Sequence, residues 1–267
     1  MQTATLLTRG LLLPSLLLLL LHPGAAQQLR PGTSPPPTRP GTRNAWLLFF
    51  SDSRLSRRWG LHAEAQLIRA RTSELDGQNV VRLGVNYHAA PALVLSGGYA
   101  HSRSYLEAGL TSPISAPEHR LYQQVQLQDN KSRVKFQHRY RLEQRWVQLM
   151  PAHSYTYLNR MRYQLRLALP LMGRELAPGV PFAVASDELF LGFGRHETNS
   201  FIKQNRAYAG LGYQISKAAS VEVGYLNQLV QLRQENRYEV SENVQLSLSF
   251  HPDFRRAAPQ APSPALD

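Results

Sequence analysis

Residues 133–147, RVKFQHRYRLEQRWV, carry the pattern that most constrains the fold of this chain. Basic residues recur there at every second position or at multiples of two: Arg133, Lys135, Arg139, Arg141 and Arg145. Residues two apart point in different directions on a helix, whereas on a strand they share one face. The alternate positions are mostly apolar, from Val134 and Phe136 to Trp146. The segment therefore predicts a long strand with one basic face and one apolar face.

The same alternation recurs along most of the chain and predicts strands rather than helices. The predicted strands are 44–51, 59–70, 80–88, 93–103, 120–129, 133–147, 155–169, 181–195, 205–216, 220–231 and 238–250. Many exceed the usual strand length of about five or six residues. We therefore expect an all-β protein, a single antiparallel up-and-down transmembrane β-barrel of about 10–12 strands.

The connections between the predicted strands alternate in length. The short ones are 52–58, 89–91, 129–131 and 217–219, and the longer ones are 72–79, 104–118, 148–154 and 196–202; 170–180 is long where a short turn is due. Short turns on one rim and long loops on the other are typical of membrane barrels, with an apolar face toward lipid and a polar face inside. A β-sandwich would have shorter strands and an exposed face rich in charge.

Two details of this pattern need an explanation. Eleven predicted strands conflict with the even number that is usual in single-chain bacterial barrels. Either a strand is missed or merged, or the proline-rich segment before residue 44 passes through or around the barrel. In 181–195 the apolar parity changes across Ser186 and Asp187. A β-bulge there would restore the alternation.

The N-terminus has the pattern of a secretory signal. Arg9 precedes an apolar run over 11–21, and small residues follow at Gly24, Ala25 and Ala26. We expect a cleaved signal peptide over 1–26, a proline-rich disordered arm over 27–43, the outer-membrane barrel over 44–251 and a disordered tail over 252–267. The predicted location is the outer membrane of a Gram-negative bacterium. The sequence has no cysteine, so disulfide bonds and a lipoprotein anchor are excluded.

The basic residues of 133–147 are expected to face the lumen together with Arg160, Arg162 and Arg166 of the next predicted strand. Two interpretations stay open. A lumen lined by basic residues favours anions, which predicts a narrow pore or pocket. A closed interior would instead pair these residues with carboxylates, because unpaired buried charge is costly. The candidate counter-charges are Glu64, Glu118, Glu143, Glu188 and Glu222.

Aromatic residues on the apolar parity are expected near the ends of the strands. Trp and Tyr gather at both interfaces of a membrane barrel, where their amphipathic rings meet the lipid headgroups. The predicted interface aromatics are Trp59, Trp146, Tyr155, Tyr157, Tyr163, Tyr213 and Tyr225. They imply outer-membrane lipid and lipopolysaccharide as partners.

Several short motifs, taken in order, resemble an uncharacterised family, domain of unknown function 2490. They are Trp46, 55–59, 118–120, 139–143, 157–160 and Tyr213 before a Ser-Lys turn. The resemblance covers roughly 44–250 and implies an outer-membrane barrel like those of Bacteroidetes-type bacteria, without implying an activity. Residues 244–250 also resemble the terminal strand that the barrel-assembly machinery reads, which makes that machinery an expected partner.

Other functions find less support in the sequence. A membrane-embedded lipid hydrolase would need a serine activated by a histidine. His101 with Ser102 or Ser104, and His153 with Ser154, are local pairs without an orienting group. The nine histidines lack ligand spacing, so neither a metal nor a cofactor is expected. Despite the net charge of +12, we expect no nucleic acid partner, since the chain is exported.

We therefore expect a non-enzymatic outer-membrane barrel, with a basic pore or pocket for small anions as the favoured function. The alternative is a structural or envelope-interaction barrel with a plugged interior, and a lipid hydrolase is the less favoured one. The oligomeric state is not predicted.

Overall fold

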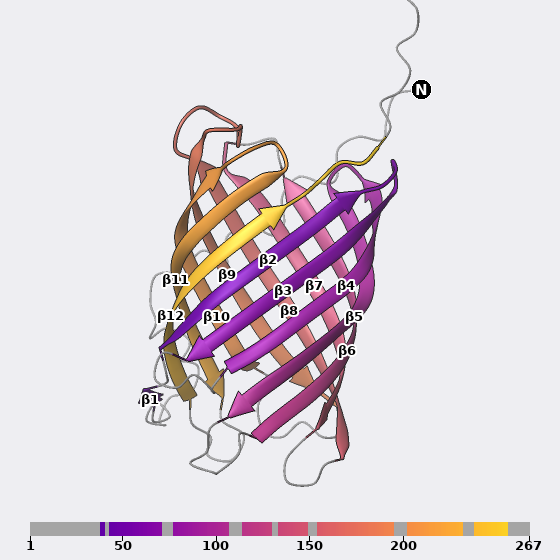
Figure 1. Ribbon diagram of the computed structural model, residues 1–267, viewed down its shortest axis with the longest axis vertical. Helices are drawn as coiled ribbons and strands as arrows, with labels where there is room; N and C mark the ends of the chain where they lie inside the picture. The colour runs from indigo at the N-terminus through magenta and orange to yellow at the C-terminus, as the bar shows by residue number, and fades with distance from the viewer. Residues whose placement is uncertain are drawn as a thin grey trace, which may run out of the picture. The chain divides into compact units, whose positions relative to one another are not determined.

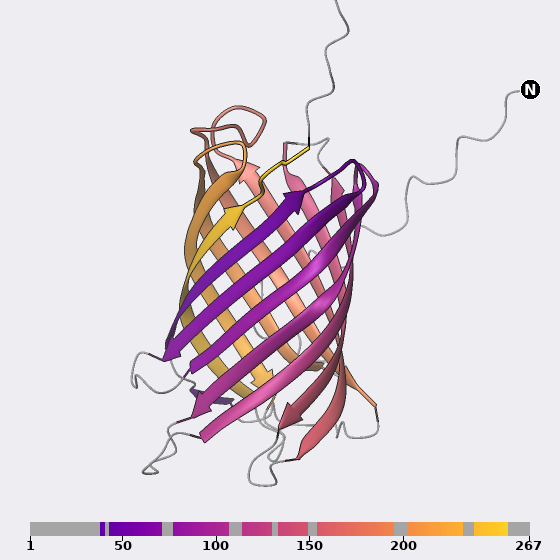
Figure 2. The same cartoon turned by 45° about the vertical axis from the view of Figure 1, so that its right-hand side comes forward.

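Within the described residues of the computed structural model, eleven strands close into one up-and-down β-barrel (Figure 1). The structure describes residues 38–40, 43–70, 77–106, 114–129, 133–148, 154–194, 202–231 and 238–255. Figure 2 shows the tilt of the strands around the barrel wall. No helix in this part of the chain has the length and apolarity needed to cross a membrane.

A short strand, β1, precedes the barrel strands β2 to β12. The bounds are β1 Thr38–Pro40, β2 Asn44–Arg54, β3 Trp59–Ala70, β4 Gly77–Ala90, β5 Leu93–Leu106, β6 Ile114–Asp129, β7 Lys135–Gln148, β8 Tyr155–Pro170, β9 Pro181–Phe193, β10 Ile202–Gln214, β11 Ala219–Gln231 and β12 Tyr238–Phe250. The prediction of an all-β, up-and-down barrel of about ten to twelve strands is confirmed.

The seam of the barrel is the pairing between β12 and β2. All other neighbouring barrel strands pair antiparallel, whereas β12 and β2 run parallel, from Asn243 beside Asn44 to Phe250 beside Ser51. In an up-and-down order with an odd number of strands, the first and the last strand point the same way. The parallel seam is therefore the direct consequence of eleven strands, and no strand was missed or merged in the prediction.

The inner ends of the predicted arm and tail belong to the sheet, which corrects their predicted extent. Strand β1 pairs with the start of β12, where Thr38 faces Tyr238. After β12, the amide of Arg54 donates to the carbonyl of Pro252 at 2.9 Å. These segments pair with backbone N–H and C=O groups of β2 and β12. Those groups would otherwise lack a partner, because β2 and β12 are offset along the seam. Residues 1–37 and the tail beyond 255 lie outside the described residues.

Alternating side chains separate a polar interior from an apolar outer wall. On β4, Val81 and Leu83 are 54% and 61% exposed, whereas Arg82 between them is 1% exposed. Successive residues of a strand point to opposite faces, so Arg82 lies inside the barrel and its two neighbours outside. The same alternation on the other strands gives an outer surface rich in Leu, Val and Phe.

Strand β9 has no bulge at Ser186 and Asp187, so that prediction is wrong. Its register against β8 runs without a shift from Phe193 to Phe182, and a shift occurs instead in β10, between Ile202 and Gln204. Phe182 faces the interior because that part of the lumen is itself apolar. It packs in an apolar cluster formed by Trp46, Leu48, Ile68, Ala168, Phe182, Val184, Tyr208 and Leu226.

Two adjacent glycines of β5 provide a test of how tightly the sheet is packed inside. A Cβ atom added to Gly98 would lie 2.1 Å from the carbonyl oxygen of Leu83 and 2.5 Å from Cα of Gly84, which are both backbone atoms. A Cβ added to Gly97 would meet only the carbonyl oxygen of Tyr122, at an ordinary 3.7 Å. The inner face therefore has no room at Gly98.

We expect Gly98→Ala to lower the free energy of unfolding by roughly 1–3 kcal/mol, the usual cost of overpacking. The matched control Gly97→Ala should leave it unchanged or slightly higher. Urea unfolding of the barrel refolded in lipid vesicles measures both. Equal stability of the two variants would contradict the close approach at Gly98.

Candidate functional site

The arginines predicted to face the lumen converge inside the barrel from β7 and β8. Antiparallel pairing places Arg141 opposite Arg162. The inward side chains, none more than 26% exposed, are Arg139, Arg141, Arg145, Arg160, Arg162 and Arg166. Lys135 begins β7 and lines a cavity, and Arg133 lies in the preceding turn, where it donates to the carbonyl of Pro170 at 3.3 Å. The structure thus brings together six of the eight predicted residues and places the other two nearer the rim.

The five predicted counter-charges all point into the barrel, with side chains at most 7% exposed: Glu64, Glu118, Glu143, Glu188 and Glu222. They come from β3, β6, β7, β9 and β11, so they are spread around the wall. Each is within ion-pair distance of at least one arginine.

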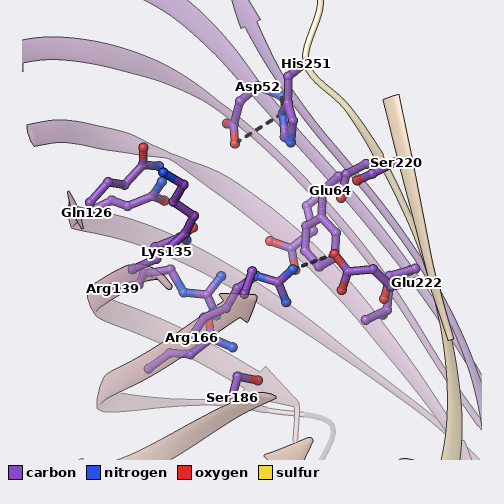
Figure 3. A pocket seen from close by; sticks show the side chains of 18 of the residues that line it. Asp52, Glu64, Gln126, Lys135, Arg139, Arg166, Ser186, Ser220, Glu222 and His251 are labelled. Atoms are coloured by element: carbon purple, nitrogen blue, oxygen red, sulfur yellow. Dashed lines mark hydrogen bonds and ion pairs between the residues drawn. The ribbon is translucent and has the colours of Figure 1, made fainter. Parts of the chain in front are cut away.

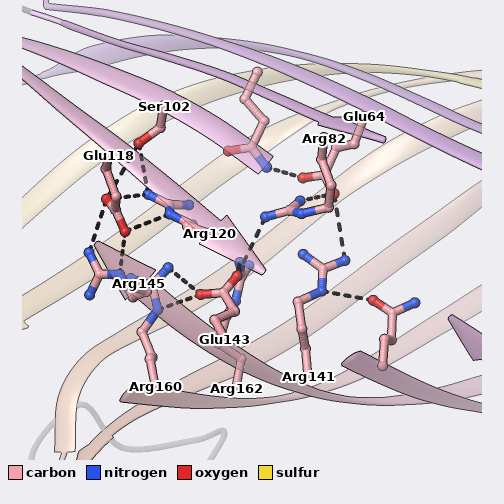
Figure 4. A network of polar contacts seen from close by, with 12 residues as sticks. Glu64, Arg82, Ser102, Glu118, Arg120, Arg141, Glu143, Arg145, Arg160 and Arg162 are labelled. Carbon is pink, nitrogen blue, oxygen red and sulfur yellow. Dashed lines mark hydrogen bonds and ion pairs between the residues drawn. The ribbon is translucent and has the colours of Figure 1, made fainter. Parts of the chain in front are cut away.

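Glu143 is the centre of an ion-pair layer across the lumen (Figure 4). Its carboxylate accepts from Nε of Arg160 at 2.7 Å, from Nη1 of Arg162 at 3.2 Å and from Nη2 of Arg82 at 3.5 Å. Arg82 also bonds Glu64. Because Arg82 and Glu64 belong to β4 and β3, the layer joins walls that are several strands apart.

The layer continues toward both rims. On the side of the longer loops, Glu118 accepts from Nε of Arg120 at 2.7 Å and also bonds Arg145. On the other side, Glu188 lies 2.7 Å from Nη2 of Arg162 and 2.8 Å from Nη2 of Arg139. Shared carboxylates of this kind bring like charges together, so removing one leaves several cations uncompensated.

Aromatic rings fill the spaces between the guanidinium groups. The guanidinium carbons of Arg82 and Arg141 lie 5.4 and 5.3 Å from the ring centre of Tyr122. Those of Arg162 and Arg206 lie 4.6 and 4.8 Å from the ring centre of Phe190. These distances are typical of cation–π contacts, which partly offset the hydration that the buried guanidinium groups lose.

All eleven barrel strands contribute to the filled interior. Each sends in at least one side chain that is at most 5% exposed: Trp46, Glu64, Arg82, Ser102, Tyr122, Arg141, Arg162, Phe190, Tyr208, Leu226 and Asn243. Arg82, Arg120, Arg206 and Tyr122 were absent from the predicted site. The parity that placed Arg141 inside also applies to them, because each lies between outward residues of its own strand.

Beyond the filled interior, on the side of the short turns, lies a cavity of about 800 Å³, which we name the vestibule. Figure 3 shows side chains that line it. Its rim includes Pro91, Lys217 and Asp253. One wall is rich in amides and basic groups: Gln124, Gln126, Gln128, Gln137, Gln164, Lys135, Arg139 and Arg166. The opposite wall is largely apolar: Trp46, Leu48, Phe50, Phe182, Leu176 and Leu226.

Arg206 lies in the vestibule wall beside an aromatic ring and a neutral amide group. Its guanidinium carbon lies 4.6 Å from the ring centre of Trp46, and its Nε donates to Oε1 of Gln228 at 3.0 Å. Arg206 forms no ion pair with any carboxylate of the described residues, although Arg166 pairs with Glu222. Among the lining residues that the structure describes, seven are basic and five are acidic. The vestibule thus contains a guanidinium group that can donate hydrogen bonds to an anion.

An imidazole group lies at the mouth of the vestibule. His251 follows directly after β12, and burial lowers its pKa even though Asp52 acts in the opposite direction. Its Nδ1 accepts a hydrogen bond from the amide of Asp52 at 3.2 Å. Acceptance at Nδ1 requires that this nitrogen carries no proton, which agrees with the lowered pKa.

The predicted interface aromatics lie on the outer wall at three levels. Trp146, Tyr155 and Tyr157 are at the long-loop ends of β7 and β8. Trp59 and Tyr213 are at the short-turn ends of β3 and β10. Tyr163 and Tyr225 lie in the middle of β8 and β11, away from both rims.

The histidine–serine pairs considered from the sequence are not assembled. Ser102 faces inward and accepts from Arg120 at 3.0 Å, whereas His101 faces outward, with its ring centre 5.0 Å from that of His119. Ser104 shares the inward parity and accepts from Gln78. His153 lies outside the described residues. Among the described residues, no three His, Asp or Glu side chains are grouped as a metal site would require.

We expect Glu143→Ala to reduce the free energy of unfolding by about 3–5 kcal/mol, because three arginines would lose a buried partner. The matched control is Glu175→Ala in the exposed turn between β8 and β9, where we expect a change of about 0.5 kcal/mol or less. Unfolding by guanidinium chloride in detergent micelles compares the stability of the two variants. If both variants unfold at the same denaturant concentration as the wild type, the ion-pair layer does not stabilise the barrel.

The model of a family described as "Protein of unknown function (DUF2490)" matches residues 43–239, so the resemblance noted in the sequence motifs is confirmed. An uncharacterised protein of Methylorubrum extorquens is 33% identical over 159 residues, which are 58% of this chain and 64% of that protein. The match thus spans less than two thirds of the relative. No solved structure matches. The chain belongs to the DUF2490 family of proteins of unknown function.

Proposed function

We propose that the protein is a non-enzymatic outer-membrane β-barrel whose vestibule binds small anions. The apolar outer wall supports a place in a membrane, since a soluble barrel would expose Leu83 and Val81 to water. The aromatics near both rims, such as Trp59 and Trp146, agree with two membrane interfaces. The signal-like N-terminus supports export to the outer membrane of a Gram-negative bacterium.

The filled interior favours a pocket over an open pore. A pore requires a continuous water path, whereas Arg82, Tyr122, Arg141, Glu143 and Phe190 are at most 1% exposed. The ion pairs among these side chains would have to break for an ion to pass. In the proposed function the ion-pair layer is therefore the closed floor beneath the vestibule.

The observation that carries the anion proposal is that the guanidinium of Arg206 forms no ion pair with a carboxylate in the part of the chain that the structure describes. A buried cation of this kind gains free energy when an anion replaces the missing counter-charge. The vestibule volume of about 800 Å³ lies in the usual range for small-molecule pockets. Because Trp46, Phe50 and Phe182 form an apolar wall, an organic anion fits better than an inorganic one.

A structural or envelope-interaction barrel is the second candidate, and the ion-pair layer favours it. Glu118, Glu143 and Glu188 hold six arginines together, an arrangement that can act as a rigid plug without any ligand. The two candidates differ in whether the vestibule has an occupant.

Trp46 provides an optical test of anion binding, because its ring contacts Arg206. In a Trp59→Phe/Trp146→Phe background, Trp46 is the remaining tryptophan. We expect saturable changes of its fluorescence with benzoate and weaker changes with phosphate. Arg206→Gln should weaken benzoate binding at least about tenfold, since a charge-assisted hydrogen bond is lost.

The control for that titration is Arg69→Gln. Arg69 lies at the long-loop end of β3, so this change should leave the affinity for benzoate unchanged. A fluorescence response that is linear with anion concentration in every variant would show no site. That result would favour the structural barrel.

The closed floor predicts the behaviour of the protein in planar bilayers. We expect no steady ion conductance from wild-type protein whose insertion is verified by protease protection. A stepwise conductance would contradict the closed pocket and support a pore. In that case Arg139→Ser/Arg141→Ser should reduce the preference for anions, measured as the reversal potential under a salt gradient.

A further inference from the structure

A polar patch interrupts the apolar outer wall on β7 to β10. We name it the outer polar patch; its members are His138, Tyr140, Tyr163, Asp187 and Asn205. Asp187 is the central residue of β9 and lies between Ser186 and Glu188. Glu188 points into the lumen, so Asp187 faces outward. Its two carboxylate oxygens accept from Nδ2 of Asn205 at 2.6 and 3.0 Å.

The patch extends over four neighbouring strands. Tyr163 lies diagonally from Asp187 across the β8–β9 pair, in which Leu165 is directly opposite Asp187. The hydroxyl of Tyr163 is 3.0 Å from Nδ1 of His138, and its ring centre is 4.9 Å from that of Tyr140. The five side chains therefore lie on one region of the outer wall, with a carboxylate acceptor at one side of Leu165 and imidazole and hydroxyl groups at the other.

A carboxylate at this place is costly for an isolated barrel in lipid. The middle of a strand corresponds to the hydrocarbon layer, where an acidic side chain lacks water and counter-ions. Asp187 pairs with no cation among the described residues, and its amide partner Asn205 is neutral. Other charged outward residues, such as Arg69 and Arg103, lie near strand ends, where headgroups and water are accessible. Asp187 thus needs a polar partner that acyl chains cannot supply.

On its β10 side Asp187 has small neighbours that allow another protein to approach, whereas Leu165 and Leu167 lie on its β8 side. Asp187 pairs with Ala207 on β10, and Ala185 pairs with Ala209. Small residues let two backbones come close within a membrane, and polar side chains then bond across the contact. On the opposite wall, Leu83 projects from the sheet and is 61% exposed.

We propose that the outer polar patch is the contact surface of a symmetric dimer, so that its partner is a second copy of this chain. A two-fold axis brings the same patch from both copies together. His138 and Tyr140 of one copy then supply donors to the Asp187 carboxylate of the other, which makes the surface complementary to itself in charge and hydrogen bonding. The inference rests on the proposed membrane location, because the cost of Asp187 depends on lipid.

The cysteine-free sequence allows a direct test by disulfide crosslinking in native membranes. Ala185→Cys places a thiol beside Asp187, and the matched control Leu83→Cys places one on the opposite wall. We expect an oxidised product of twice the chain mass with Ala185→Cys and a weak one or none with Leu83→Cys. Adding Asp187→Leu to Ala185→Cys should lower the crosslinked fraction about fivefold or more.

Two further readouts separate the dimer from the barrel itself. Heat-modifiable mobility on gels reports whether each variant is folded, and protease protection reports membrane insertion. Failure of these readouts in the wild type would refute the membrane location rather than the dimer. In inserted protein, single-molecule photobleaching should show two subunits for wild type and one for Asp187→Leu.

The dimer is overturned if inserted wild-type protein shows a single bleaching step. Equal crosslinking of Ala185→Cys and Leu83→Cys would also overturn it, since that result indicates random collisions. A crosslinked product of a different mass would identify another protein as the partner of this surface.

Discussion

The seam between β2 and β12 is the contact on which the rest of the barrel depends. Without it, both strands would expose a row of unpaired backbone groups, which is a severe cost away from water. With it, every barrel strand has two neighbours and the interior becomes a separate compartment. The odd strand number makes this seam parallel, so the barrel begins at one rim and ends at the other. Strand β1 and residues 252–255 extend the pairing at the two ends.

Closure of the barrel also brings the inward side chains into contact with one another. Glu143 and Glu188 stabilise arginines from both sides of the lumen, and Tyr122 and Phe190 fill the gaps between them. Such a layer stabilises the barrel only when it is complete, because each removed partner leaves buried charge. Arg206 lines the vestibule and forms no ion pair with a described carboxylate, which gives the anion proposal its physical basis.

Much of the fold and part of the site follow from parity along single strands. The rule that places Arg139 and Arg141 on one face also places Tyr140 on the other. It would have added Arg82 and Arg206 had it been applied to every strand. It failed at β9, where Phe182 and Phe190 share the inner face with Glu188. Apolar residues were assigned to lipid there, although part of the lumen is apolar too.

The sequence by itself determined that the chain forms long strands and that their side chains alternate in polarity. It also determined that an up-and-down sheet of these strands has one polar face. Those features depend on the pleat and on neighbouring residues, which are local. The tertiary structure alone decided which charges meet: that Glu143 joins Arg82 to Arg160, that Arg206 contacts Trp46, and that Asp187 lies beside Asn205. Each of these contacts depends on the number of strands, their register and the seam, which bring together residues far apart in the chain.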